Sequence, residues 1–399
     1  MSSPHSESTR HALALPAPDP DAQALSAALV DEIRRAIETD GGSIGFDRYM
    51  EMALYAPRLG YYHNGSRKFG ADGDFVTAPE LSPLFARAIA RHCALALKEL
   101  EGGDLLEFGP GSGALAAELL ADLERLGALP GRYLMLELSG ELRQRQHERL
   151  CASVPHLTER VEWLQVLPAQ GFAGVVLANE VLDAMPVMCF AVRDGAVFER
   201  RVGYDSVGRL DFRERTADVP TRAQVDNITA ALPGPLPDGY RSEFSPALDA
   251  WVGALGARLA RGLVLICDYG YPRGEYYHPQ RRDGTLLCHY RHRAHADPFF
   301  YPGLQDISAN VDFTVVAEAA ATAELDLLAY TSQAQFLLGS GLLETLELAD
   351  NAAAYLRVAQ EIKLLTLPGE MGDRFQVMAL GKHYAPTMRF SLRDFRGRL

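Results

Sequence analysis

Three glycines in the segment DLLEFGPGSGALAAELL (residues 104–120) have the spacing of a loop that lets the backbone approach a nucleoside closely. Two fingerprints fit the segment. One is the dinucleotide pattern G-x-G-x-x-G/A, through Gly109, Gly111 and Ala114. The other is the tighter acid-x-G-x-G-x-G loop of enzymes that use S-adenosyl-L-methionine (SAM), through Glu107, Gly109, Gly111 and Gly113. The glycines alone therefore predict a nucleoside site and leave NAD and SAM open.

The acids beside this loop distinguish the two cofactors. Glu107 precedes the first glycine by two residues, where the pyrophosphate of NAD would be repelled. SAM carries an ammonium and a sulfonium but no phosphate, so Glu107 favours SAM. Glu137, at the end of the next expected strand, is placed to accept hydrogen bonds from the ribose hydroxyls of either cofactor. A glycine turn that serves only helix–strand packing is the alternative.

A second set of polar residues follows the apolar strand in LANEVLDAMPV, namely Asn179, Glu180 and Asp183. The two carboxylates are one helical turn apart and can face the same side. Such a pair could hold a guanidinium group and accept its proton after methyl transfer. Alternatively, Asn179 or Asp183 caps the following turn.

Composition narrows the class of protein. The chain has 399 residues with 48% hydrophobic content, as in ordinary globular proteins. Its net charge of -13 argues against broad nucleic-acid binding, and no apolar run is long enough to insert into a membrane. Five scattered cysteines and an N-terminal stretch containing acids predict a cytoplasmic protein. His289, His292 and His295 are evenly spaced, but no further ligand completes a metal site, so we expect none.

From residue 104 onward, apolar strands alternate with helices, which predicts an α/β fold with a Rossmann-type, doubly wound sheet. Helices and loops precede this core, and segments with hairpin or helical character interrupt it. The expected order is a disordered tail (1–22), an N-terminal helical and cofactor-covering segment (23–100), the first part of the SAM-binding core (101–190), an insertion with a hairpin (191–258), a core strand (259–272), a second insertion (273–313), C-terminal core strands and helices (314–384) and a basic tail (385–399).

The chain from about residue 40 to 382 resembles the MidA-like family of SAM-dependent methyltransferases. The resemblance rests on ordered motifs, among them GFDRYMEMALYAPRLGYY, GDFVTAPELSPLFARAIA, LLEFGPGSGAL, YLMLELSGELRQRQHERL, LANEVLDAMPV and ICDYGY. It implies that Glu107, Glu137 and the three glycines contact SAM, and that GDFVTAPE covers the cofactor through Asp74, Thr77 and Glu80, for which a purely structural role is the alternative. Ser112 departs from the family pattern, because many members carry Arg there.

The resemblance also implies a substrate. Mitochondrial members of the family act in the assembly of respiratory complex I and dimethylate an arginine of a core subunit that has a bacterial NADH dehydrogenase counterpart. We therefore expect a protein arginine N-methyltransferase acting on such a subunit, in a chain that could form a dimer. The alternatives are a SAM-binding assembly chaperone with little catalysis and a methyltransferase of another protein or a small molecule.

Overall fold

The computed structural model describes residues 15–64, 77–169, 171–346 and 351–399. Its main sheet has the strand order β14-β15-β9-β4-β1-β2-β3, and β13 pairs with the end of β9. The strands are β1 Asp104–Phe108, β2 Tyr133–Leu136, β3 Val161–Leu164, β4 Phe172–Asn179, β9 Leu259–Tyr271, β13 Val311–Asp312, β14 Asp326–Ser332 and β15 Phe375–Lys382. Strand order reverses between β1 and β4, the place where open α/β sheets bind ligands.

The predicted α/β, doubly wound fold is confirmed. The strands β9, β4, β1, β2 and β3 pair in parallel. By contrast, β15 runs antiparallel to both β9 and β14. The apolar pattern of RFQVMALGK predicts a strand, but a pattern of side chains carries no information about strand direction.

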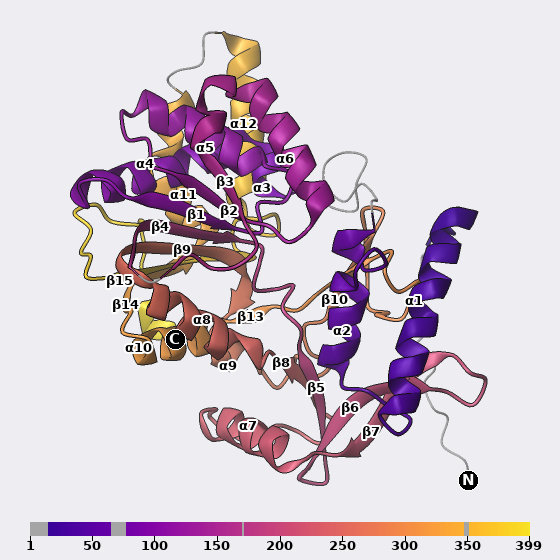
Figure 1. Ribbon diagram of the computed structural model, residues 1–399. Coiled ribbons are helices and arrows are strands. Elements are labelled where there is room, and N and C mark those ends of the chain that lie inside the picture. The colour runs from indigo at the N-terminus through magenta and orange to yellow at the C-terminus, as the bar shows by residue number, and fades with distance from the viewer. Residues whose placement is uncertain (1–14, 65–76, 170, 347–350) are drawn as a thin grey trace.

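Alternate residues of the central strands enter two different hydrophobic cores. On β1, Leu105 packs into one core and Leu106 into the other, and Val175 and Val176 repeat this on β4. Successive side chains of a strand point to opposite faces, so a strand that is apolar throughout must be covered on both. Figure 1 shows the resulting three layers. One face carries α4 Pro83–Glu99, α5 Ala114–Arg125, α6 Gly140–Ser153, α11 Gln333–Gly339 and α12 Ala352–Thr366, and the other carries α8 Ala247–Arg258 and α10 Phe313–Thr322.

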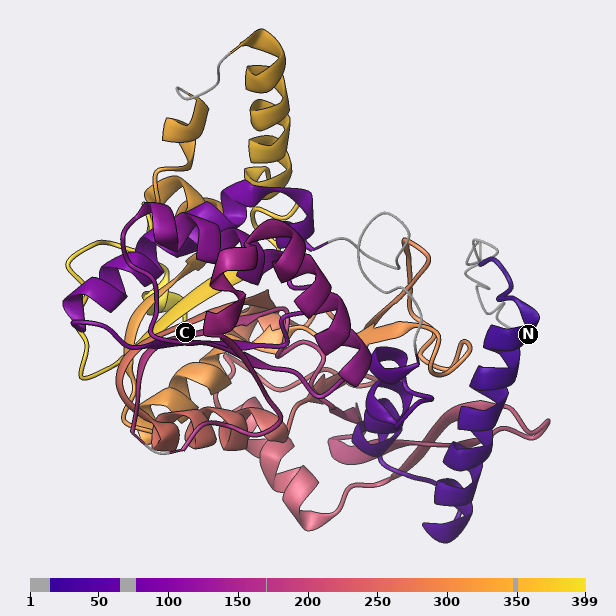
Figure 2. The same ribbon diagram turned by 45° about the horizontal axis from the view of Figure 1, so that its top comes forward.

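A second body lies beside the main sheet, as Figures 1 and 2 both show. It combines α1 Pro20–Thr39 and α2 Phe46–Tyr55 with two antiparallel sheets. One sheet has the order β7-β6-β5-β8, from Leu210–Thr216, Ala196–Tyr204, Met188–Arg193 and Arg241–Phe244; the other has the order β11-β10-β12, from Arg293–His295, Leu287–Tyr290 and Asp306–Ser308. Residues from α1, α2, β6 and β12 share one core, so segments distant in sequence form this body together.

Shorter elements connect these parts. The helix α3 Ala78–Leu81 precedes α4, α7 Val219–Ala230 lies between β7 and β8, and α9 Arg273–Tyr276 follows β9. The helix α1 begins at Pro20, ahead of the boundary at residue 23 that composition suggested, because the Asp19 side chain accepts a hydrogen bond from the Ala22 amide at 2.9 Å. Among the described residues, no helix is both long and apolar enough to span a bilayer.

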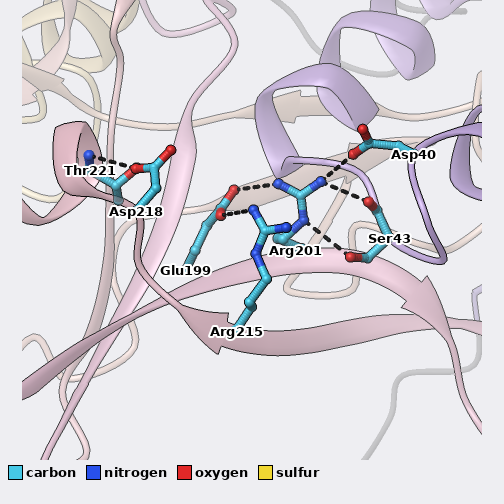
Figure 3. A network of polar contacts seen from close by, with 7 residues as sticks. All are labelled: Asp40, Ser43, Glu199, Arg201, Arg215, Asp218 and Thr221. Carbon is cyan, nitrogen blue, oxygen red and sulfur yellow. Dashed lines mark hydrogen bonds and ion pairs between the residues drawn. The ribbon is translucent and has the colours of Figure 1, made fainter.

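A buried ionic network joins α1 to the four-stranded sheet (Figure 3). The Arg201 guanidinium donates to Glu199 at 2.9 Å and to the Ser43 carbonyl at 2.7 Å, and it also pairs with Asp40 at the end of α1. Arg215 reaches the other carboxylate oxygen of Glu199 at 3.2 Å. Glu199 and Arg201 are both buried, so each charge is stabilised by the other in place of water.

Arg201→Met should therefore lower the free energy of unfolding by about 3 kcal/mol, because it leaves Glu199 buried with one fewer cation. Urea unfolding measures the change. Arg209→Met, in the turn between β6 and β7, is the matched control. Arg209 pairs with Asp205 at the surface, so its loss should lower the free energy of unfolding by less. Equal losses of unfolding free energy in the two variants would show that the buried network stabilises the fold no more than a surface ion pair does.

Candidate active site

A cavity with a volume of about 440 Å³ opens at the carboxyl ends of β1, β2 and β4. This is the size of site that takes a small molecule or cofactor, and its position is the switch point of the sheet. The main sheet supplies the glycine loop and the carboxylates after β2 and β4. The second body supplies the opposite wall, with Tyr55, Tyr62, His63, His289, Asp306 and Ser308.

The glycine loop lines the cavity through Gly109 and Gly111, whose φ angles of 54° and 52° favour residues without a Cβ. A Cβ on Gly109 would also lie 3.3 Å from the Val181 side chain. Gly113 has a different place. It precedes α5 with φ 80°, and a Cβ there would lie 3.2 Å from the Gln146 Cα, so its absent side chain allows α6 to pack closely.

The two acids that favoured SAM both lie at this cavity. Glu107 is buried and accepts a hydrogen bond from the Tyr133 hydroxyl at 2.7 Å; burial raises the pKa of Glu107 to about 7. Glu137 accepts hydrogen bonds from the Ser139 amide at 2.8 Å and the Gln146 side chain at 3.1 Å, and burial raises its pKa as well. These bonds hold the Glu137 carboxylate at the end of β2.

Gln146 is a residue that sequence reasoning missed. Its amide nitrogen donates to the Gly111 carbonyl at 2.8 Å as well as to Glu137, so one side chain joins the glycine loop to the expected ribose acid. The sequence does carry a signal, because a glutamine stands on the buried face of α6 beside Leu142 and Leu150. An amide on an apolar face needs buried hydrogen-bond partners.

The covering segment is only partly described. Asp74 lies outside the described residues, whereas Thr77 lines the cavity. Glu80 instead accepts a hydrogen bond from Ser112 and pairs with Arg149 at 3.3 Å. Glu80 thus connects α3 to the glycine loop through Ser112, the position where the family pattern has Arg.

Asn179, Glu180 and Asp183 come together at the cavity, where β4 ends. Asn179 donates to Glu180 at 3.3 Å. Glu180 has a φ of 53°, a left-handed conformation that is unusual for a residue with a side chain. Its amide donates to the Cys267 carbonyl on the neighbouring strand at 2.9 Å, which supports this turn of the backbone.

A further acid, Asp268 on β9, holds the loop after β4 and was also not predicted from the sequence. One of its carboxylate oxygens accepts hydrogen bonds from the amides of Val181, Leu182 and Asp183 at 3.1, 2.8 and 3.4 Å. Only the pairing of β4 with β9 brings Asp268 to this position, so local sequence around the loop contains no sign of it.

The carboxyl groups here raise one another's pKa. Burial, and then the charge of Asp268, raise the pKa of Glu180 to about 8. The same two causes raise the pKa of Asp183, and burial raises that of Asp268 to about 7. A cation that enters the cavity makes ionisation of these groups easier. The electrostatics therefore favour a positively charged ligand.

Comparison with known proteins identifies the family. A family model described as "Putative S-adenosyl-L-methionine-dependent methyltransferase" matches residues 88–331. The chain belongs to this family. A Drosophila melanogaster relative, the mitochondrial protein arginine methyltransferase NDUFAF7 homolog, is 32% identical over 85% of this chain and 82% of its own length. Human mitochondrial protein arginine methyltransferase NDUFAF7 is 26% identical over 86% of this chain and 81% of its own length.

A solved structure supports the same family assignment. A Burkholderia thailandensis protein bound to S-adenosyl-homocysteine superposes with a TM-score of 0.91 at 46% identity, covering 96% of this chain and 100% of that chain. These findings confirm the MidA-like resemblance and the choice of SAM over NAD. The predicted cytoplasmic location is wrong, because the curated relatives are mitochondrial proteins. The composition of the first residues was an insufficient guide to location.

The pKa of Glu180 predicts a pH-dependent stability for the ligand-free protein. A carboxyl whose folded-state pKa is raised from 4.5 to about 8 contributes stability at low pH that is lost as pH rises through this window. Glu180→Gln removes the titration, so the difference in unfolding free energy between wild type and this variant should change across the window. Thermal unfolding at a series of pH values tests this, with the exposed Glu324→Gln as control. A difference that stays constant with pH would contradict the raised pKa.

Proposed function

We propose that this chain is a SAM-dependent protein arginine N-methyltransferase whose substrate is a subunit of a respiratory NADH dehydrogenase. The observation that carries the proposal is the position of Glu180 and Asp183, at the same cavity as the glycine loop. The names of the curated relatives support arginine as the target. The MidA-like resemblance supports the NADH dehydrogenase subunit.

The residues of the glycine loop and those at the ends of β1 and β2 fit SAM. Gly109 and Gly111 let the backbone approach a ligand, and Glu137 presents a carboxylate with lone pairs for ribose hydroxyls. Glu107 adds a buried acid at the same cavity, which fits the positively charged ammonium and sulfonium of SAM better than a phosphate. When bound, SAM supplies an electrophilic methyl group: the nitrogen lone pair forms the new carbon–nitrogen bond, and the electrons of the broken carbon–sulfur bond stay on sulfur.

The residues of the loop after β4 fit the substrate. Glu180 and Asp183 orient the guanidinium by charge-assisted hydrogen bonds, and most of the acceleration comes from this positioning. The nitrogen that gains the methyl group must lose a proton. Glu180 can take this proton, because the bound cation favours its ionised form, while burial and the charge of Asp268 keep its pKa above the usual value of a carboxyl, closer to the pH of the reaction.

The test is to find the modified residue. Extract from cells that lack this gene is incubated with the purified protein and SAM carrying a deuterated methyl group, and labelled peptides are identified by mass spectrometry. We expect label on an arginine of an NADH dehydrogenase subunit. Label on a different residue type would refute arginine methylation, whereas label on an arginine of another protein would refute only the assigned substrate.

Glu180→Gln should lower kcat for the arginine substrate by roughly two to four orders of magnitude, because the amide cannot accept the proton. Affinity for S-adenosyl-homocysteine, measured by calorimetry, should stay within about twofold, since the substitution leaves Glu137 and the glycine loop unchanged and keeps the shape of the side chain. Glu324→Gln is the surface control. A variant that restored NADH dehydrogenase assembly in cells without methylating would favour the assembly chaperone instead.

A further inference from the structure

The part of the cavity wall that the second body supplies carries a carboxylate of its own. Asp306 stands at the start of β12, where antiparallel pairing with β10 sets it opposite His289. Both residues line the cavity together with Glu180 and Asp183. Asp306 is only 6% exposed, and its charge is among the causes that raise the pKa of Glu180 and of Asp183. Carboxylates therefore face the same space from two separate elements.

A pair of tyrosines sets the position of this carboxylate. The Tyr62 hydroxyl donates to Asp306 at 2.9 Å, and the Tyr62 ring stacks on Tyr55 with centroids 5.5 Å apart and an interplanar angle of 21°. The Tyr55 hydroxyl donates to the Ala184 carbonyl at 3.0 Å, next to Asp183. The chain of contacts from Asp306 through the tyrosines to the loop after β4 links the two acidic walls.

We propose that Asp306 and the Glu180–Asp183 pair clamp the substrate guanidinium from opposite edges, with Tyr62 as the positioning residue for Asp306. A guanidinium is planar and presents five N–H donors along fixed directions, so acids on two sides can both bond to it. The ammonium of lysine has its three donors on a single nitrogen, so its hydrogen bonds start from one point and span a shorter distance between the acids than those of a guanidinium do. Asp306 would then select arginine over lysine and leave proton removal to the other wall.

This inference rests on the proposed function, and its test uses the labelled arginine peptide identified above together with its Arg→Lys version. Binding to protein saturated with S-adenosyl-homocysteine is measured by calorimetry, and kcat and KM are measured with SAM. Asp306→Asn should raise Kd and KM for the arginine peptide on the order of tenfold to a hundredfold, the effect of losing a charged hydrogen-bond partner. It should lower kcat far less than Glu180→Gln does. It should also reduce the preference for arginine, measured as the ratio of kcat/KM for the arginine peptide to kcat/KM for its lysine version.

Tyr62→Phe keeps the ring and removes the hydroxyl, so it should raise Kd for the peptide by roughly threefold to tenfold. Added to Asp306→Asn, it should have no further effect, because Tyr62 acts through Asp306. Tyr49→Phe is the matched control: the Tyr49 hydroxyl also holds the second insertion, through the Pro298 carbonyl at 2.6 Å, but Tyr49 does not line the cavity. Affinity for S-adenosyl-homocysteine and the unfolding midpoint monitor the fold of every variant.

The outcomes separate the two claims. If the wild type methylates arginine and Asp306→Asn leaves Kd, KM and the arginine preference unchanged, the clamp is wrong while the proposed function stands. Equal effects of Tyr62→Phe and Tyr49→Phe on peptide binding would overturn the positioning role of Tyr62. This comparison remains valid even where Asp306→Asn fails to fold. If the wild type labels no arginine, the proposed function fails and the clamp fails with it.

Discussion

The buried carboxylate of Asp268 is the interaction on which the chemistry of the cavity depends. It accepts hydrogen bonds from three successive amides after β4 and so holds the loop that carries Glu180 and Asp183. Burying a charge is costly unless hydrogen bonds compensate it, and here backbone amides do so. The arrangement brings several acids close together, and burial, followed by their mutual repulsion, raises the pKa of Glu180 and Asp183. A site under such repulsion gains most when it binds a cation.

The second body of the protein covers this acidic edge of the sheet and makes it one wall of a cavity. In a doubly wound sheet alone, the carboxyl ends of the strands would face solvent. Here α2 and the residues after it bring Tyr55 and Tyr62, and β12 brings Asp306. The buried network around Arg201 ties α1 to the same body. Burial of acids such as Asp183 and Asp306 strengthens their electrostatic interactions, so these distant segments contribute to the chemistry as well as to the fold.

The parts of the site that the sequence predicts well are those carried by one short segment. The glycine loop, Glu107 and Glu137 belong to single strand–loop units, and the structure places all of them at or beside the cavity. Asp268 and Asp306 were not predicted. Asp268 reaches the site through the pairing of β9 with β4, and Asp306 through the packing of β12 in the core that it shares with α1, α2 and β6. The direction of β15 and the packing role of Gly113 against Gln146 likewise depend on tertiary contacts. Local patterns identify chemistry within a segment and carry no information about which segments meet.

A crystal structure of the protein with S-adenosyl-homocysteine and an arginine-containing substrate peptide would test the central claim most directly. The account predicts that the glycine loop and Glu137 contact the nucleoside, and that the guanidinium lies between Glu180 and Asp306 with nitrogen–oxygen distances of about 2.7–2.9 Å. An arginine side chain bound outside this cavity, or a different side chain occupying the space between the acidic walls, would contradict it.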